Sequence, residues 1–153
     1  MIRYMKIEEN PLEIKIKYHR SDLEKVQSLT IGDWIDLRAA EHVELKAGEY
    51  RLISLGVSMK LPEGFEAHIA PRSSSFSKWG FLQVNSVGVV DNSYSGTNDI
   101  WKLPVYATRD AVIEVNDRIC QFRIMQRMPQ VTFREVEALD GSDRGGFGST
   151  GSR

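Results

Sequence analysis

The residues whose types and spacing could carry out chemistry are concentrated in the segment from Asn85 to Gly96. There an apolar pair, Val89-Val90, leads into the carboxylate of Asp91, and Tyr94 follows three residues later. We expect a tight hairpin with a functional tip, where desolvation raises the pKa of Asp91 toward the range of a general base. The amide of Asn85 could read a nucleobase edge, and the ring of Tyr94 could stack on a sugar or base. An ordinary turn with an exposed aspartate is the alternative.

Two further segments could bind an anion. Pro71-Arg72-Ser73-Ser74-Ser75 ends an expected strand, and a helical turn over 73–78 would bring free amides, hydroxyls and a guanidinium to one point. A serine-rich turn whose arginine pairs with a surface acid is the alternative. The segment 139–153 contains five glycines around Arg144 and Phe147, so its amides could approach a phosphate closely. It lacks the ending of a Walker A loop, and a mobile linker would look similar.

Polar residues also occur where the expected core should be apolar. Asp36 places a carboxylate beside such a position, and Gln121 interrupts the apolar run 119–124, where a polar group needs a partner. The histidines show no ligand spacing, so we expect them to be structural or exposed: His19, His42 and His68.

The elements that must position these residues are short strands. About ten apolar or alternating runs, with no long amphipathic helix, predict an all-β barrel or jelly roll and disfavour a parallel βαβ arrangement. A capping-box pattern at 21–24 predicts a short helical turn over 23–27. The expected strands are 12–18, 34–39, 43–46, 50–55, 57–61, 65–70, 81–84, 100–107, 111–115, 118–126 and 131–136.

Length and composition limit the possible classes of protein. The 153 residues suit one domain with a substantial core. Twenty basic residues against 21 acids give a net charge of -1, which argues against wholesale binding to nucleic acid or an anionic membrane. The single cysteine, Cys120, excludes an intrachain disulfide and fits a reducing cytoplasm. With no signal pattern and no apolar run of membrane length, we expect a soluble protein.

Taken in order, five motifs resemble those of the trimeric deoxyuridine triphosphatases (dUTPases). The resemblance covers about residues 32 to 151, and its specificity comes from five motifs in the family's order at near-family spacing. The motifs are Asp36-Leu37-Arg38-Ala39, Pro71-Arg72-Ser73-Ser74, Gly88-Val89-Val90-Asp91 to Tyr94-Ser95-Gly96, Asp117-Arg118-Ile119-Cys120-Gln121, and Gly145-Gly146-Phe147-Gly148-Ser149-Thr150-Gly151.

The resemblance implies a distorted β-barrel or jelly-roll protomer in a homotrimer with shared sites. Residues 1–139 would form the barrel, and the glycine-rich arm 140–153 would close over a neighbouring subunit's site as a lid. The implied reaction hydrolyses dUTP to dUMP and pyrophosphate by water attack on the α-phosphorus, with Mg²⁺ held largely through the substrate phosphates. It would remove dUTP and supply dUMP for thymidylate synthesis, without a nucleic-acid or membrane partner.

The same resemblance implies a role for each matching residue. Asp91 would be the general base, and Tyr94 would stack under the deoxyribose and exclude a 2′-hydroxyl by a clash. Asp36 would touch the metal through water. The uracil edge would be read by Asn85, Gly88, Val89 and Val90; phosphates would be held by Arg72, Ser73, Ser74 and Gln121; and the arm would contribute Arg144, Phe147 over the uracil, Gly148, and Ser149 and Thr150 on the γ-phosphate.

Three positions depart from the usual family pattern. Ser74 stands where many members have glycine, so backbone approach to a phosphate can differ. Arg144 stands three residues before Phe147, whereas the common form separates them by five, which puts its reach to the γ-phosphate in doubt. Trp101 follows an unusual continuation of the third motif and is either a pocket wall or, as we expect, core.

Three alternatives belong to other classes. A dCTP deaminase would keep the phosphate contacts but act on C4 of cytosine, and release of ammonia rather than pyrophosphate would identify it. A nucleotide-sensing interaction protein would keep partner binding in Asp91→Asn, whereas an enzyme would lose turnover. A structural β trimer without a ligand would leave Asn85, Tyr94 and Phe147 without a purpose.

Overall fold

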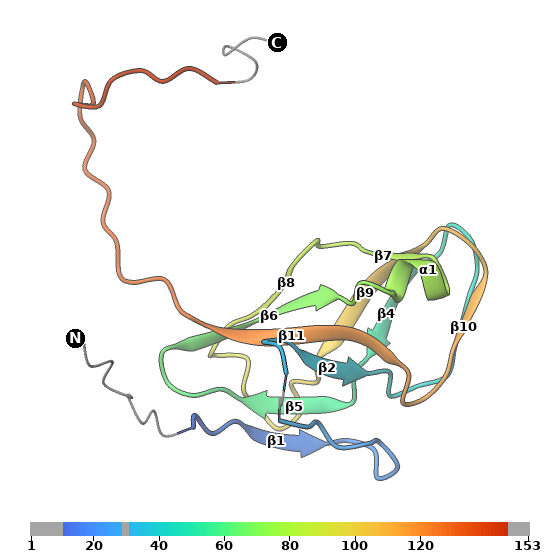
Figure 1. Cartoon of the computed structure of the whole chain (residues 1–153). Helices are drawn as coiled ribbons and strands as arrows, with labels where there is room; N and C mark the ends of the chain where they lie inside the picture. Colours follow the sequence, from blue (N-terminus) through green and yellow to red (C-terminus); the bar gives the residue numbers. More distant parts are fainter. Residues whose placement is uncertain (1–10, 29–30, 147–153) are drawn as a thin grey trace, which may run out of the picture.

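The computed structural model describes residues 11–28 and 31–146. Within them the chain forms eleven strands and one short helix, α1 (Ser75–Trp79), which confirms the prediction of a mostly β protomer. The strands form four small antiparallel sheets (Figure 1). No helix of the described chain is long and apolar enough to cross a membrane.

One four-stranded sheet carries most of the residues of interest. Its strand order is β2 (Ile35–Arg38), β11 (Arg118–Gln126), β6 (Phe65–Pro71) and β8 (Gly88–Val90), and all neighbours are antiparallel. β11 is the longest strand and pairs with β2 on one side and β6 on the other. Segments far apart in the sequence are therefore joined through β11.

The other strands complete the body around this sheet. A three-stranded sheet has the order β4 (Tyr50–Ser54), β9 (Lys102–Ala107) and β7 (Phe81–Gln83). Two pairs remain, β1 (Lys15–Tyr18) with β5 (Val57–Lys60), and β3 (Val43–Leu45) with β10 (Ala111–Ile113).

The core is filled by the inward-facing residues of all these strands. Trp101 is 1% exposed and meets Phe122 of β11 edge to face, with ring centroids 5.3 Å apart and planes at 84°. Trp79 of α1 stacks on Phe81 at 6.1 Å, which ties the helix to β7. Burial of these large rings supplies much of the apolar area removed from water. The expectation that Trp101 is a core residue is confirmed.

The helical turn predicted over 23–27 is wrong, because residues 24–28 form no regular structure. The backbone amides that a helix would use are bound by distant side chains instead. The amide of Glu24 donates to Asn116 Oδ1 at 2.8 Å, and that of Val26 donates to Tyr18 Oη at 2.7 Å. Tertiary hydrogen bonds thus outweigh a weak local preference for helix.

The strand predicted over 131–136 is also wrong for this chain. Residues 127–146 are exposed and contain no strand, and Figure 1 shows this segment leaving β11 and running away from the body. A strand needs a neighbour for its backbone hydrogen bonds, and residues 131–136 have none within the described part of the chain. Apolar side chains are left in solvent as a result: Phe133 is 95% exposed and Leu139 is 84% exposed.

The segment 85–96, predicted as a hairpin, begins in a crossing between two sheets. β7 pairs with β9, whereas β8 pairs with β6, so residues 84–87 cross from one sheet to another. Ser86 takes a positive φ of 57° at this crossing, which a serine tolerates in a tight turn. After β8 the chain turns, with the amide of Tyr94 donating to the carbonyl of Asp91 at 3.1 Å.

Candidate active site

The four-stranded sheet β2-β11-β6-β8 places residues of four sequence motifs on adjacent strands. In its register, Asp36 of β2 lies opposite Gln121 of β11, which lies opposite Ala70 of β6. Arg72 follows directly after β6, and β8 pairs with the side of β6 that faces away from β11. The structure therefore brings Asp36, Arg72 and Gln121 together at one end of the sheet.

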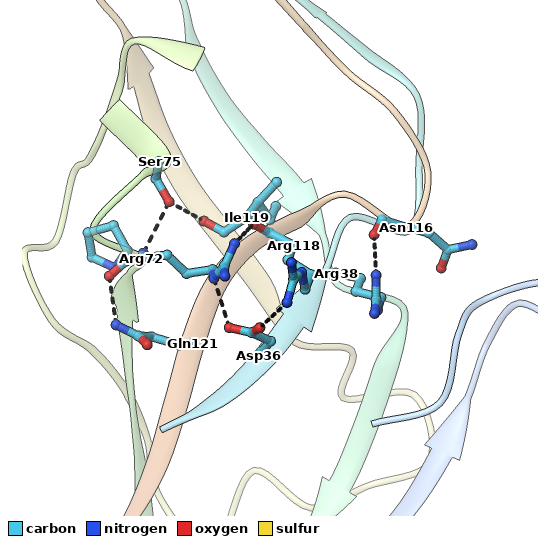
Figure 2. A network of polar contacts seen from close by, with 9 residues as sticks. Asp36, Arg38, Arg72, Ser75, Asn116, Arg118, Ile119 and Gln121 are labelled. Carbon is cyan, nitrogen blue, oxygen red and sulfur yellow. Dashed lines mark hydrogen bonds and ion pairs between the residues drawn. The ribbon is translucent and has the colours of Figure 1, made fainter. Parts of the chain in front are cut away.

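Asp36 lies at the centre of an ionic cluster (Figure 2). Its Oδ1 is 2.8 Å from Arg72 Nε, and its Oδ2 is 3.2 Å from Arg118 Nη1. Arg72 Nη1 also donates to the carbonyl of Arg118 at 3.4 Å. The carboxylate thus holds two guanidinium groups on one surface, which suits binding of a polyanion.

Arg118 is the residue of this cluster that the sequence-based site prediction omitted. It begins β11, within the fourth motif, and its side chain is half exposed beside a carboxylate on a different strand. An arginine next to Asp117 at the start of a strand is an ordinary register residue in sequence. Only the pairing of β2 with β11 shows that it faces Asp36.

Of the three serines after Arg72, one is buried and hydrogen-bonded to the backbone, and two are accessible to solvent. Ser75 is fully buried, donates to the carbonyl of Ile119 at 3.0 Å and accepts the Arg72 amide at 3.1 Å. Ser73 is exposed, and Ser74 is the N-cap of α1 without a side-chain capping bond. The hydroxyls of Ser73 and Ser74 are therefore the ones available to a ligand. The helical turn considered over 73–78 is present as α1, which runs from Ser75 to Trp79.

Gln121 satisfies the expectation that a polar side chain in an apolar strand needs a partner. Its Nε2 donates to the carbonyl of Pro71 at 3.1 Å, immediately before Arg72. This contact links β11 to the end of β6 and leaves the side-chain oxygen of Gln121 beside the cluster (Figure 2).

Asp91 follows β8 and is exposed. Its Oδ1 accepts hydrogen bonds from the hydroxyl of Ser93 and from the Ser93 amide, the latter at 2.7 Å. These bonds, the hydroxyl first, lower the pKa of Asp91 below its ordinary value. The expected rise in the pKa of Asp91 is thus wrong, because hydrogen bonds to the ionised carboxylate outweigh desolvation at an exposed position.

A hollow of about 400 Å³ lies beside Asp91, within the range of small-molecule sites. Tyr94 lines it and donates its hydroxyl to the carbonyl of Ile100 at 3.2 Å, which holds the ring across the turn. Trp101 also lines it, so this residue is both core and pocket wall. The lining residues are Leu52, Val89, Val90, Asp91, Tyr94, Ile100, Trp101 and Lys102.

Asn85 lies at the other end of β8, exposed, next to Gly88. Its Oδ1 accepts a hydrogen bond from Gln83 Nε2 at 3.0 Å. A Cβ at Gly88 would lie 3.2 Å from Ile69 Cβ and 3.6 Å from Asn85 Nδ2, so glycine lets these side chains pack closely against the backbone of β8. The exposed amide of Asn85 therefore lies directly beside the backbone of β8.

Asp91 and Arg72 lie at opposite ends of the paired strands β6 and β8. Val90 pairs with Ala67, and Asp91 lies one residue further on. Arg72 lies beyond the other end of β6, six residues from the level of Asp91. At 3.3 Å per strand residue, the backbones at the levels of Asp91 and Arg72 are about 20 Å apart along β6.

The residues predicted in the C-terminal arm are only partly described. Arg144 is exposed and forms no ion pair within the described chain. Phe147, Gly148, Ser149 and Thr150 lie outside the described residues.

The side chains of the described residues do not form a metal cage. Within 11–28 and 31–146 no three histidine, cysteine or carboxylate side chains gather as ligands. Magnesium bound chiefly by phosphates and water needs only one or two carboxylates, so this donor set fits such a bound ion.

The chain is similar to known proteins over most of its length. A family model described as dUTPase matches residues 34–151. The SPbeta prophage-derived deoxyuridine 5'-triphosphate nucleotidohydrolase YosS of Bacillus subtilis strain 168 is 54% identical over 142 residues, covering 93% of this chain and all of that protein. The deoxyuridine 5'-triphosphate nucleotidohydrolase of Finegoldia magna is 42% identical, over 80% of this chain and 87% of that protein.

Solved structures with the same fold include two phage proteins. The dUTPase of Staphylococcus bacteriophage 80alpha with dUPNHPP has a TM-score of 0.73 at 18% identity, covering 92% of this chain and 99% of that one. A variant of the dUTPase of phage phi11 of S. aureus, described as coordinating a structural Mg(II) ion, has a TM-score of 0.71 at 16% identity, covering 84% of this chain and 99% of that one.

Proposed function

Since the chain belongs to the dUTPase family and hydrolyses dUTP, we propose that it does so at active sites shared between the subunits of a homotrimer. The observation that carries this proposal is the separation of about 20 Å between Asp91 and Arg72 along β6 in one chain. A backbone separation of this size favours a site in which the two groups come from different subunits.

The nucleoside end of the substrate binds beside β8 in this proposal. Asn85 and the backbone of Gly88, Val89 and Val90 read the uracil edge, because backbone and amide groups offer both donors and acceptors. Tyr94 stacks under the deoxyribose and leaves no room for a 2′-hydroxyl, which excludes UTP by a clash. Asp91 orients a water molecule and takes its proton as that water attacks the α-phosphorus, with pyrophosphate leaving on the opposite side.

The phosphates bind at the ionic cluster of another subunit. Arg72, held by Asp36, neutralises charge on the phosphate oxygens. The hydroxyls of Ser73 and Ser74, and the second Nε2 hydrogen of Gln121, supply further hydrogen-bond donors. Bound Mg²⁺ would neutralise phosphate charge and hold the chain of phosphates in a reactive conformation. Asp36 uses both oxygens for arginines, yet a carboxylate has about four acceptor positions, so it still accepts from metal-bound water.

An apolar surface on the sheet β4-β9-β7 supports the homotrimer. Tyr50, Tyr106 and Leu82 lie side by side in the register of three adjacent strands, and they are 59%, 44% and 51% exposed. Leu52 on the same sheet is 45% exposed. Contiguous exposed apolar residues of this kind mark protein interfaces.

The C-terminal segment also exposes apolar residues, which supports contact with other subunits. Its exposed apolar residues from Met128 to Leu139 find no cover on their own chain, within the described residues. We propose that residues 1–139 form the barrel domain and that the arm 140–153 closes over a neighbour's site. Phe147 would cover the uracil, Gly148 would allow close approach, Ser149 and Thr150 would contact the γ-phosphate, and Arg144 would contribute to substrate binding.

The proposed role in the cell is removal of dUTP and supply of dUMP for thymidylate synthesis. The proposed location is the cytoplasm, where a lone thiol such as Cys120 stays reduced. No nucleic-acid or membrane partner is needed for this role.

Subunit complementation tests the shared site. Arg72→Ala and Asp91→Ala each remove an essential group, so each homotrimer should lose nearly all pyrophosphate release from dUTP with magnesium. Trimers assembled from both variants contain some sites with an intact Arg72 from one subunit and an intact Asp91 from another. Activity should therefore return to a sizeable fraction of the unmutated level.

The composition of the mixed trimers is checked by native mass spectrometry. Absence of activity in verified mixed trimers would show that both groups act within one chain and would overturn the shared site. A double variant carrying both substitutions, mixed with an unmutated chain, serves as the matched control for dilution of active subunits.

A further inference from the structure

Gln83 is a buried polar residue that none of the roles above uses. It ends β7, is 8% exposed, and lies between Asn85 and the backbone of β6. Its Nε2 donates two hydrogen bonds, one to the carbonyl of Ile69 at 2.9 Å and one to Asn85 Oδ1 at 3.0 Å. Both hydrogens of the Gln83 amide are therefore in use.

These two bonds set the direction of the Asn85 amide. A backbone carbonyl can only accept, so Gln83 must turn its NH₂ group toward Ile69. The second hydrogen of that NH₂ group then requires an acceptor, which Asn85 supplies with its Oδ1. Rotating the Asn85 amide by half a turn would place two NH₂ groups against each other. The fixed carbonyl of Ile69 therefore determines, through Gln83, the orientation of the Asn85 side-chain amide.

The remaining amide atoms, Gln83 Oε1 and Asn85 Nδ2, are consistent with this orientation of the two side chains. Gln83 Oε1 is buried without a hydrogen-bond partner in the described chain, which shows that the Nε2 contacts, and not Oε1, determine how this amide lies. Asn85 is exposed, and no acceptor within the described residues takes a hydrogen bond from its Nδ2. Gly88 lies beside both amides, since its Cβ would be 3.6 Å from each amide nitrogen.

We propose that Gln83 is a positioning residue that fixes Asn85 with its NH₂ group toward the base, and so favours uracil over cytosine. Uracil presents the O4 acceptor where cytosine presents the N4 donor, so an outward NH₂ group fits uracil and opposes cytosine. This inference rests on the proposed function, in which Asn85 reads the base edge. Gln83 itself does not touch the substrate.

The test replaces Gln83 by methionine, which has a similar length and no donor. The probes are the non-hydrolysable α,β-imido analogues of dUTP and dCTP, whose dissociation constants are measured by calorimetry on the full chain with magnesium. Gln83→Met frees the Asn85 amide to rotate, so affinity for the dUTP analogue should fall about 3- to 10-fold, the size of one net hydrogen bond. Affinity for the dCTP analogue should not fall, and kcat for dUTP should stay within about twofold while KM rises.

Thr108→Val is the matched control. It removes one side-chain donor to a backbone carbonyl, that of Gly80, and lies away from Asn85. A general loss of stability should affect both variants, whereas the ratio of the two dissociation constants should change only in Gln83→Met. Equal ratios in Gln83→Met and the unmutated chain would overturn the proposal.

The Asn85→Ala background separates this inference from the proposed function. If Gln83 acts only through Asn85, adding Gln83→Met to Asn85→Ala should change neither dissociation constant further. An unchanged uracil preference in Asn85→Ala alone would refute the proposed role of Asn85. A lost preference in Asn85→Ala with a full preference in Gln83→Met would refute only the role of Gln83.

A measurement on the unmutated chain guards against a variant that fails to fold. The side-chain NH₂ protons of Gln83 should exchange slowly with solvent in nuclear magnetic resonance spectra, because both are hydrogen-bonded and buried. Those of Asn85 should exchange rapidly until the dUTP analogue binds. Rapid exchange at Gln83, or slow exchange at Asn85 in the free protein, would contradict the proposed orientation.

Discussion

Asp91 accepts hydrogen bonds from Ser93 that favour its ionised form, so it remains a base throughout the neutral range. A group whose pKa is lowered in the folded protein keeps its charge until the pH falls below the ordinary value, here 3.8. The carboxylate therefore does not limit activity near neutral pH. In the proposed mechanism, the effectiveness of Asp91 as a base comes from the position of the attacking water.

Ser93→Ala removes the donor that lowers the pKa of Asp91 most. The pKa of Asp91 should rise, so the acid side of the profile of kcat/KM against pH should move to higher pH, with activity at pH 8 nearly unchanged. Ser95→Ala removes a neighbouring hydroxyl that does not contact Asp91 and controls for titration of the substrate phosphates. Identical acid limbs in the two variants would contradict the assigned cause.

Asp36→Asn tests whether Asp36 positions Arg72 in the ionic cluster. The substitution removes the charge that pairs with Arg72 and Arg118, so Arg72 should lose its fixed position and kcat/KM for dUTP should fall about 10- to 100-fold. Glu24→Gln is the matched control, because it breaks a similar pair with Arg38 at 2.8 Å that does not include Arg72. Steady-state kinetics that show equal small losses in both variants would argue against a positioning role for Asp36.

At the scale of elements, the strands depend on a few turns that only glycine fits. Gly56 joins β4 to β5 with a φ of 65°, and a Cβ there would lie 2.4 Å from Ala40 Cβ. Gly64 precedes β6 with a φ of 80°, but its Cβ would meet nothing within 4 Å. The two positions share the left-handed backbone and differ in the space available.

Gly56→Ala should therefore cost more free energy of unfolding than Gly64→Ala. Backbone strain costs about 1 kcal/mol or somewhat more at either site, and overpacking adds roughly 1 to 3 kcal/mol at Gly56 alone. Urea unfolding at one fixed protein concentration measures both, since oligomer stability depends on concentration. Similar losses in the two variants would show that the contact with Ala40 relaxes without cost.

At the scale of the whole molecule, the chain leaves apolar surface that one copy does not cover. The row Tyr50, Tyr106 and Leu82 and the segment 127–139 are exposed in the single chain. Burial of such surfaces against other copies is favourable because apolar area is removed from water. The proposed trimer thus accounts for both the exposed surfaces and the divided site.

A chain ending at Leu139 tests the arm separately from the barrel. We expect pyrophosphate release from dUTP to be severely reduced, because the residues proposed to close the site are removed, while the circular dichroism and the molecular mass of the assembly stay unchanged. The full chain should act on dUTP alone when dUTP, UTP, dTTP and dCTP are compared with magnesium. Full activity of the shortened chain would rule out a catalytic role for residues 140–153.

The sequence by itself determined the class of fold, nearly all the strands and the family to which the chain belongs. Strand patterning is local, since alternation with a period of two residues depends only on which face is buried. The motif residues could be identified for a similar reason, because their types and order along the chain carry the resemblance. The core position of Trp101 was expected for a similar reason, because a tryptophan in a sheet is usually buried.

Only the tertiary structure decided which groups meet. The pairing of β8 with β6, the amides of Glu24 and Val26 bound by distant side chains, and the contact of Asp36 with Arg118 all join residues far apart in sequence. The link from Ile69 through Gln83 to Asn85 likewise depended on the crossing between two sheets. Hydrogen bonds and charges act over a few ångströms of space, and local sequence patterns carry no information about which distant atoms come that close.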